Sequence, residues 1–349
     1  MPDKPSGFRF SATCVGSVPF QDVIGTCRVI LERFPLMPFW PQFVKRSLLE
    51  DMSIQYSEGL PLLEINEEKR SLIVSQSKER EPELVAFYEQ YLAQDMDRFA
   101  ISREYAPGLY ALLDLMDEGE AAGEASYVKG QTVGPITFAA GILGRDGRPL
   151  LHDPELAEAM ARGLAIKALW QVGELGRTGR RPIIFIDEPY LSGFGSAFSS
   201  IQRHEVIDML RIVIDYLREN SDTLIGIHCC GNTDWSMVMD AGPDIVNFDA
   251  FDHMDYFLLY PEDIVRFFEA GGAVAWGIVP TSNFRGSESV EQLLEKIEDG
   301  LRSVHESGLS LELISQGSIL TPACGMGTMK PDEAGAAMDL LYRLSQALS

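Results

Sequence analysis

The sequence has few basic residues and no long apolar run. Lysine and arginine together number 29 against 52 aspartates and glutamates, which gives a formal net charge of −23. This sign of charge excludes a general nucleic-acid-binding surface and an anionic-membrane-binding surface. No stretch approaches the roughly 18 apolar residues of a membrane-spanning helix, and residues 1–7 contain no apolar signal core. We therefore expect a cytoplasmic protein with an acidic, solvated surface and with neither nucleic acid nor membrane as a partner.

Cysteine is also scarce, with five residues in a chain of 349. Five cysteines in a chain of this length do not form the disulfide framework of a small secreted domain. Two of them, Cys230 and Cys324, each lie beside a glycine where an apolar run ends, and Cys230 is two residues from His228. Clustering of cysteine with histidine indicates a metal site in a reducing compartment.

Internal repeats, low-complexity tracts and linker-like segments are absent from the sequence, which favours one catalytic domain over residues 1–349. Short apolar runs alternate with helix-length amphipathic segments, the pattern of βα units around a parallel sheet. Eight runs have the composition of strands: Phe8–Cys14, Met37–Trp40, Tyr127–Gly130, Ile183–Asp187, Thr223–His228, Ile245–Phe248, Ala273–Ile278 and Ser315–Leu320. Eight is the strand number of a closed TIM barrel, so we predict a single α/β (β/α)8 TIM barrel.

The chain between the second and third expected strands is longer than a βα unit requires. Leu60–Ile65 and Ser71–Ser75 have strand composition and flank the polar run 66–70. We predict a hairpin insertion over the barrel mouth, within residues 55–110 or so, followed by a helix at Glu81–Met96.

The residues that indicate chemistry follow the ends of apolar strands. His228 and Cys230 are two residues apart, so their side chains share one face where the strand ends, and Cys324 ends the last expected strand. Imidazole and thiolate ligands suit Zn²⁺, and three protein ligands with one position left for substrate are typical of a catalytic zinc site. Cys229 points to the other face and reads as a buried small hydrophobe.

Carboxylates and a serine lie at the ends of other expected strands. Asp249 is a candidate fourth zinc ligand, and the alternative is that it caps the following turn. Asp187 and Glu188 follow four apolar residues, so at least one is expected to face the pocket and bind a substrate ammonium group. Ser17, in the loop after the first strand, is a candidate to bind a substrate carboxylate together with backbone amides.

These motifs resemble, in order, the catalytic C-terminal barrel of cobalamin-independent methionine synthase. The wider superfamily includes uroporphyrinogen decarboxylase and the methylcobamide:coenzyme M methyltransferases. The resemblance covers residues 15–325 and rests on these segments: Val15–Pro19, Val128–Gly130, Gly134–Thr137, Ile186–Pro189, His228-x-Cys230, Pro243–Asp249 and Pro322–Gly325. His228-x-Cys230 with the distant Pro322-x-Cys324-Gly325 is the specific part.

The resemblance implies a set of roles. It makes His228, Cys230, Cys324 and Asp249 the zinc ligands, although the methionine synthases have glutamate at the position of Asp249. It places Ser17 and Asp187 in the homocysteine site, with Asp187 also as the catalytic carboxylate.

The chain departs from the family in the part that binds folate. It has no room for the N-terminal barrel that shares in folate binding. A second acid of the homocysteine site has no clear counterpart in residues 43–52. The loop after the seventh strand, residues 276–282, lacks the family's histidine.

The leading prediction is a zinc-dependent methyltransferase that forms methionine from homocysteine. The methyl donor is left open between a methylcorrinoid such as methylcobalamin, free or on a corrinoid protein, and methyltetrahydrofolate. The absent histidine favours the corrinoid, because breaking a Co–CH3 bond needs no proton on the leaving group. Methylation of coenzyme M is the nearest alternative, and Asp187 favours an amino acid instead. A non-catalytic corrinoid- or thiol-binding protein and a uroporphyrinogen decarboxylase-like enzyme are further alternatives.

Overall fold

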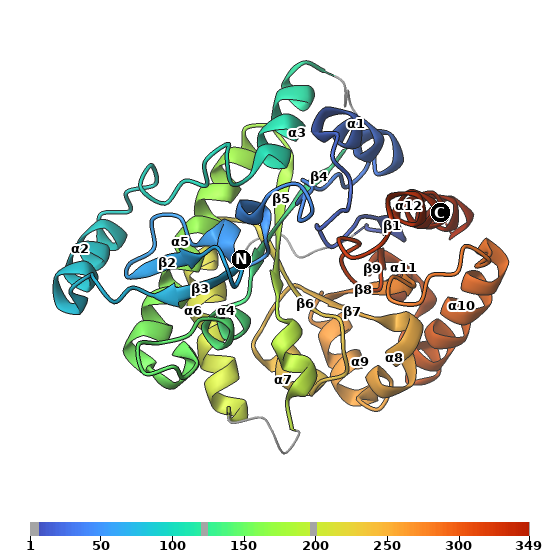
Figure 1. The fold of residues 1–349 in the computed structure, drawn as a ribbon. Coiled ribbons are helices and arrows are strands. Elements are labelled where there is room, and N and C mark those ends of the chain that lie inside the picture. The colour runs from blue at the N-terminus through green and yellow to red at the C-terminus, as the bar shows by residue number, and fades with distance from the viewer. Residues whose placement is uncertain (1–6, 120–124, 196–200, 349) are drawn as a thin grey trace.

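A curled sheet of seven parallel strands, surrounded by helices, forms the centre of the chain (Figure 1). The computed structural model describes residues 7–119, 125–195 and 201–348. In spatial order the strands are β1 (Ser11–Ala12), β9 (Ser318–Pro322), β8 (Ala273–Val279), β7 (Ile245–Phe248), β6 (Leu224–Cys229), β5 (Arg181–Asp187) and β4 (Tyr127–Val133). The chain is thus mixed α/β with a TIM-like fold.

The first and second expected strands differ most from the prediction. β1 has only two residues, because Arg9 and Phe10 adopt left-handed backbone with φ of 43° and 61° and regular pairing starts after them. The segment expected as the second strand, Met37–Trp40, forms one isolated parallel bridge instead of a strand: Phe39 pairs with Lys129. Proline at positions 38 and 41 removes two amide donors from this segment, which prevents a continuous ladder.

Twelve α-helices are present among the described residues. They are α1 (Val23–Arg33), α2 (Arg80–Leu92), α3 (Pro107–Asp117), α4 (Pro135–Gly141), α5 (Pro154–Gly176), α6 (Arg203–Asn220), α7 (Trp235–Asp240), α8 (Ala250–Phe257), α9 (Pro261–Glu269), α10 (Val290–Glu306), α11 (Leu311–Gln316) and α12 (Pro331–Leu348). Polar side chains cap the N-termini of several helices. At α5, Asp153 accepts a hydrogen bond from the Leu156 amide, and at α10, Ser289 and Gln292 form a capping box. None of the described helices is both long and apolar enough to cross a lipid bilayer.

An antiparallel pair, β2 (Leu63–Asn66) and β3 (Ser71–Val74), lies outside the parallel sheet. Figure 1 shows it on the same side of the molecule as α2, away from α10 and α12. Ile73 of β3 forms a parallel bridge with Leu143 in the loop after α4. That this pair is an insertion into a closed barrel stays a prediction.

The inner face of the sheet is apolar at one end and polar at the other. A buried cluster of Phe8, Met37, Ile183, Phe185, Leu224, Ile245, Ala273, Ala275 and Ile319 occupies the interior. Side chains alternate along a strand, so two or four residues further on the same face carries Asp187, His228, Asn247 and Thr321. All four are buried. The carboxyl ends of the strands therefore collect polar side chains above an apolar floor.

Candidate metal centre

His228, Cys230 and Cys324 converge at the carboxyl ends of β6 and β9. One ligand atom from each residue lies within 4.8 Å of the others. Among the described residues, this is the one group of at least three His, Cys, Asp or Glu side chains close enough to hold a metal ion. His228 is on β6, Cys230 follows its last residue, and Cys324 lies two residues after β9. The expectation that these three side chains converge is confirmed; that they hold zinc stays a prediction.

One ring nitrogen of His228 is left open toward this group. The ring is 2% exposed, and its Nδ1 lies 2.6 Å from Oδ1 of Asn247. Its Nε2 is buried, has no hydrogen-bond partner of ordinary geometry, and has the Cys230 sulfur as its polar neighbour. A buried nitrogen without a partner costs free energy unless something binds it, and imidazole nitrogen is a preferred zinc ligand. The donor set therefore fits a borderline-soft divalent cation.

The Cys230 and Cys324 thiols affect each other's pKa in opposite directions. Hydrogen bonding with Cys324 lowers the pKa of the Cys230 thiol, and hydrogen bonding with Cys230 raises the pKa of Cys324. Both sulfurs are partly buried. A metal ion binds cysteine as the thiolate, so metal binding at this site would release protons from the thiols. Cys229, by contrast, is fully buried outside the group, and burial raises the pKa of its thiol to about 12.

Asp249 lies outside the group of three. It is the N-cap of α8, and its Oδ1 accepts a hydrogen bond of 2.9 Å from the Asp252 amide. This is the helix-capping alternative described above. Its role as fourth zinc ligand stays a prediction.

Asp187 ends β5 directly beside His228, with which it pairs in register. It is 4% exposed, and its Oδ1 is buried with no hydrogen-bond partner. Burial raises the pKa of this carboxyl to about 6, while the neighbouring His228 and Lys129 act in the opposite direction. An unpartnered carboxylate oxygen next to the candidate ligands suits a cationic group of a substrate.

Glu188, unlike its neighbour Asp187, has hydrogen-bond partners at both carboxylate oxygens. Its carboxylate accepts hydrogen bonds from the Ile136 amide (2.9 Å), the Thr137 amide (2.8 Å) and the Thr137 hydroxyl (2.6 Å). These donors belong to the first turn of α4, so Glu188 satisfies the free N–H groups of that helix. Burial raises the pKa of Glu188 to about 7. Both carboxylate oxygens of Glu188 thus accept hydrogen bonds within the protein, and its role in substrate binding stays a prediction.

Ser17 lies against the loop that follows Cys324. Its hydroxyl accepts a hydrogen bond of 3.3 Å from the Gly327 amide, and its carbonyl accepts one from Met326. A Cβ at Gly325 would lie 2.1 Å from the Ser17 hydroxyl oxygen, so only glycine fits beside Cys324 in this arrangement. The structure thus places Ser17 next to the Cys324 loop.

Two buried polar residues of the sheet strands, Lys129 and Asn247, are not predicted as site residues by the sequence. Lys129 on β4 is fully buried, donates to the Val15 carbonyl at 2.6 Å, and lies 4.5 Å from the Phe185 ring centroid. Burial lowers the pKa of this lysine to about 8, against the opposing charge of Asp187. Asn247 on β7 was read only as part of an apolar strand. The alternation of β7, which places Asn247 on the same face as Ile245, is the signal that identifies it as inward-facing.

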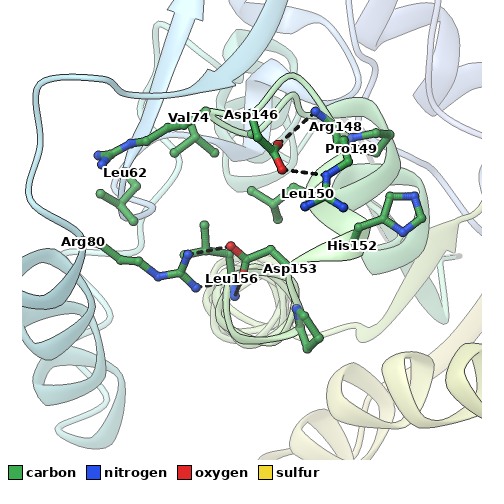
Figure 2. A pocket seen from close by; sticks show the side chains of 13 residues that line it. Leu62, Val74, Arg80, Asp146, Arg148, Pro149, Leu150, His152, Asp153 and Leu156 are labelled. Atoms are coloured by element: carbon green, nitrogen blue, oxygen red, sulfur yellow. Dashed lines mark hydrogen bonds and ion pairs between the residues drawn. The ribbon is translucent and has the colours of Figure 1, made fainter.

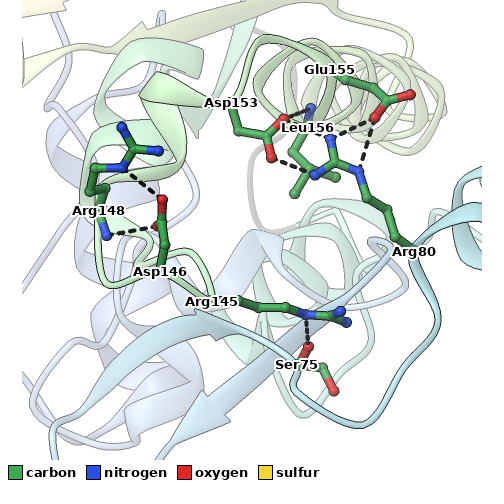
Figure 3. A network of polar contacts seen from close by, with 8 residues as sticks. All are labelled: Ser75, Arg80, Arg145, Asp146, Arg148, Asp153, Glu155 and Leu156. Carbon is green, nitrogen blue, oxygen red and sulfur yellow. Dashed lines mark hydrogen bonds and ion pairs between the residues drawn. The ribbon is translucent and has the colours of Figure 1, made fainter.

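A cavity of about 380 Å³ lies elsewhere, between β3, the 144–150 loop and the start of α5 (Figure 2). Four of its charged side chains form ion pairs: Arg80 pairs with Asp153, and also with Glu155 outside the lining, and Arg148 pairs with Asp146 (Figure 3). None of the three soft ligands lines this cavity. It is therefore separate from the candidate metal centre.

No family model matches the chain. A methionine synthase from Methanocaldococcus jannaschii is 26% identical over 209 residues, which are 59% of this chain and 60% of that protein, so the chain spans less than two thirds of this relative. Among solved structures, a GH113 beta-mannanase, AaManA from Alicyclobacillus acidocaldarius in complex with ManMIm, is 14% identical with a TM-score of 0.35, covering 69% of this chain and 79% of that chain. At that TM-score neither fold nor activity transfers. The chain thus has a distant sequence relationship to a methionine synthase, at the level of a broad superfamily.

Proposed function

We propose that the chain is a zinc-dependent methyltransferase that methylates the thiol of homocysteine to form methionine. The observation that carries this proposal is the convergence of His228, Cys230 and Cys324, with the His228 Nε2 buried and unpartnered. Two thiolates and one neutral imidazole are a three-ligand set that leaves one position for substrate. The distant relationship to a methionine synthase supports the same reaction class.

A zinc ion held by these three residues would supply the positive charge that deprotonates an incoming thiol, which has a pKa of about 8.5 when free. The chain's own residues have the remaining tasks. The two cysteine thiolates donate charge and keep the bound sulfur nucleophilic. The open Oδ1 of Asp187 accepts a hydrogen bond from the substrate ammonium group, and the Ser17 hydroxyl binds the substrate carboxylate.

Homocysteine is preferred over coenzyme M because of Asp187. A buried carboxylate beside the ligands attracts an ammonium group and repels a sulfonate. Coenzyme M has a sulfonate and no ammonium group, so its methylation is the second candidate. A methylcorrinoid is the preferred donor over methyltetrahydrofolate, because residues 276–282 contain no histidine to protonate a folate leaving group.

We propose a closed barrel of eight strands in which residues 38–42 replace the second strand, supported by the bridges Phe39–Lys129 and Ser17–Gln42. The β2–β3 pair is then the insertion over the mouth. Asp249 is proposed as a fourth ligand that leaves its capping position when no substrate is bound.

The test combines metal analysis with X-ray absorption at the zinc edge. We expect one zinc per chain, with two sulfurs in its coordination shell before and three after addition of homocysteine. His228→Ala and Cys324→Ala should each lose most of the zinc and all methyl transfer. Cys229→Ala is the matched control, because it removes an adjacent thiol that lies outside the group. Full zinc content in either site variant would refute the site.

The donor is identified separately. Methylcobalamin and methyltetrahydrofolate are each supplied with homocysteine, and methionine is quantified by mass spectrometry. Zinc and thiol binding without methyl transfer from any donor would favour a binding protein. A zinc shell that responds to coenzyme M and not to homocysteine would favour the second candidate.

A further inference from the structure

Asn247 links the inner faces of four strands at the level of His228. It is fully buried on β7 and pairs in register with His228 on β6. Its Oδ1 lies 2.6 Å from the His228 Nδ1. Its Nδ2 lies 2.8 Å from the Ala275 carbonyl of β8 and 2.8 Å from the Thr321 hydroxyl of β9. All three contacts are within ordinary hydrogen-bond lengths.

These contacts fix which way the amide faces. A backbone carbonyl only accepts hydrogen bonds, so the Asn247 NH2 group must face Ala275 and its oxygen must face His228. An amide oxygen also only accepts, so the Nδ1 of His228 must carry the proton. In a neutral imidazole the lone pair is then on Nε2. That nitrogen is buried and unpartnered.

We propose that Asn247 is a positioning residue that holds His228 in the Nδ1-protonated tautomer with Nε2 presented to the metal. Partners of this kind orient a ligating histidine and raise its basicity. The positioning role of Asn247 rests on the proposed metal site, and the effect of a charge at residue 247 rests in addition on the proposed thiol substrate.

A neutral amide has a consequence that a carboxylate does not share. The site already contains two cysteines that bind metal as thiolates, and Asp187 neighbours His228 in register. A second carboxylate at residue 247 would add negative charge where an anionic thiol has to bind. Asn247 accepts the histidine proton without adding charge. Asparagine at position 247 therefore orients His228 without weakening thiol binding. A carboxylate at this position would also orient His228, but its charge would weaken the binding of an anionic thiol.

The test uses Asn247→Leu, which keeps the branching at Cγ and has no hydrogen-bonding group, and Asn247→Asp, which keeps the acceptor. Gln171→Leu is the matched control, because Gln171 is a buried amide that accepts from Trp40 Nε1 at 3.1 Å and lies on α5, outside the metal group. Zinc affinity is measured by competition with a chromophoric chelator. Histidine tautomers are read from long-range ¹H–¹⁵N spectra of the metal-free protein.

Asn247→Leu should weaken zinc binding about 10–100-fold and remove the Nδ1-protonated signal of His228. Asn247→Asp should retain zinc affinity and that tautomer, with weaker homocysteine binding. Gln171→Leu should change neither. If Asn247→Leu does not fold, Thr321→Val removes one anchor of the amide and should weaken zinc binding in the same direction by a smaller factor.

The outcomes separate this inference from the proposed function. If the wild-type protein binds zinc and Asn247→Leu binds it equally well, the role of Asn247 is refuted and the proposed function stands. A neutral His228 that carries its single proton on Nε2 in the wild-type protein also refutes the role of Asn247. If the wild-type protein binds no zinc, both proposals are wrong.

Discussion

Replacing Glu188 by alanine tests whether this carboxylate binds substrate or holds the fold. The change removes an acceptor that receives two amide hydrogen bonds and one hydroxyl hydrogen bond from α4. The hydroxyl of Thr137 can rotate to another acceptor, but the two amides cannot. Leaving a buried donor without a partner costs about 1–3 kcal/mol, so two donors give about 4 kcal/mol of lost stability.

That loss corresponds to a measurable shift in melting temperature. With an unfolding entropy of about 2.1 cal/mol/K per residue, 349 residues give roughly 0.7 kcal/mol/K, so about 4 kcal/mol lowers Tm by about 5 °C. Circular dichroism during urea and thermal unfolding measures both quantities. Glu188→Gln should lose about half as much, since its oxygen replaces one acceptor while its NH2 faces the other donor.

The control is the neighbouring carboxylate. Asp187→Asn changes a side chain whose Oδ1 has no hydrogen-bond partner, so its effect on stability should be smaller, while the KM for homocysteine should rise. A Glu188→Ala protein that unfolds like the wild type and shows a raised KM would refute the assignment of Glu188 to α4. It would return this residue to the substrate site.

Three further changes test other features of the structure. Burial lowers the pKa of Lys167 to about 7, so between pH 7 and about 10.5 the unfolded chain binds a proton that the folded chain does not. Stability should therefore rise with pH across this range; Lys167→Met should be more stable than the wild type at pH 7 and flatten the profile, and an unchanged slope in urea titrations would contradict the pKa. Gly277→Ala places a Cβ 2.4 Å from a backbone oxygen and 2.9 Å from the Cα of Ala323, so it should shift the chain leading to Cys324 and weaken zinc binding, as a chelator competition would show. Removing zinc with a chelator should lower Tm, and adding zinc back should restore it, because a ligand that binds only the folded state stabilises that state.

The three soft ligands could be predicted because each lies between the end of an apolar run and a following glycine. Parallel strands place their carboxyl ends at one edge of the sheet, so side chains distant in sequence meet there. Asn247 could not be recognised in the same way. Its role depends on its register with His228, which is set by how β6 and β7 pair and not by any local pattern.

Asp249 shows where one pattern has two physical interpretations. An acid at the end of a strand and at the start of a helix suits both a metal ligand and an N-cap, and the sequence contains nothing that separates them. The structure has the cap. The expected strand at Met37–Trp40 shows a second limit: apolar composition predicted pairing, and the prolines at 38 and 41 reduced it to a single bridge.

Among the described residues, only segment 38–42 supplies β-bridges between β1 and β4, the two edges of the seven-stranded sheet. Gln42 and Trp40 donate amide hydrogen bonds to Gly16 and Lys129, but no continuous ladder joins β1 to β4 on this side. The strands that carry the soft ligands, β6 to β9, are joined by parallel ladders, with one register shift between Gly277 and Val279 where β8 pairs with β9. Amide hydrogen exchange should therefore be fastest along segment 38–42 and slowest in β6 to β8. Local opening of segment 38–42 would leave the carboxyl ends of β6 to β9, which carry the soft ligands, in place.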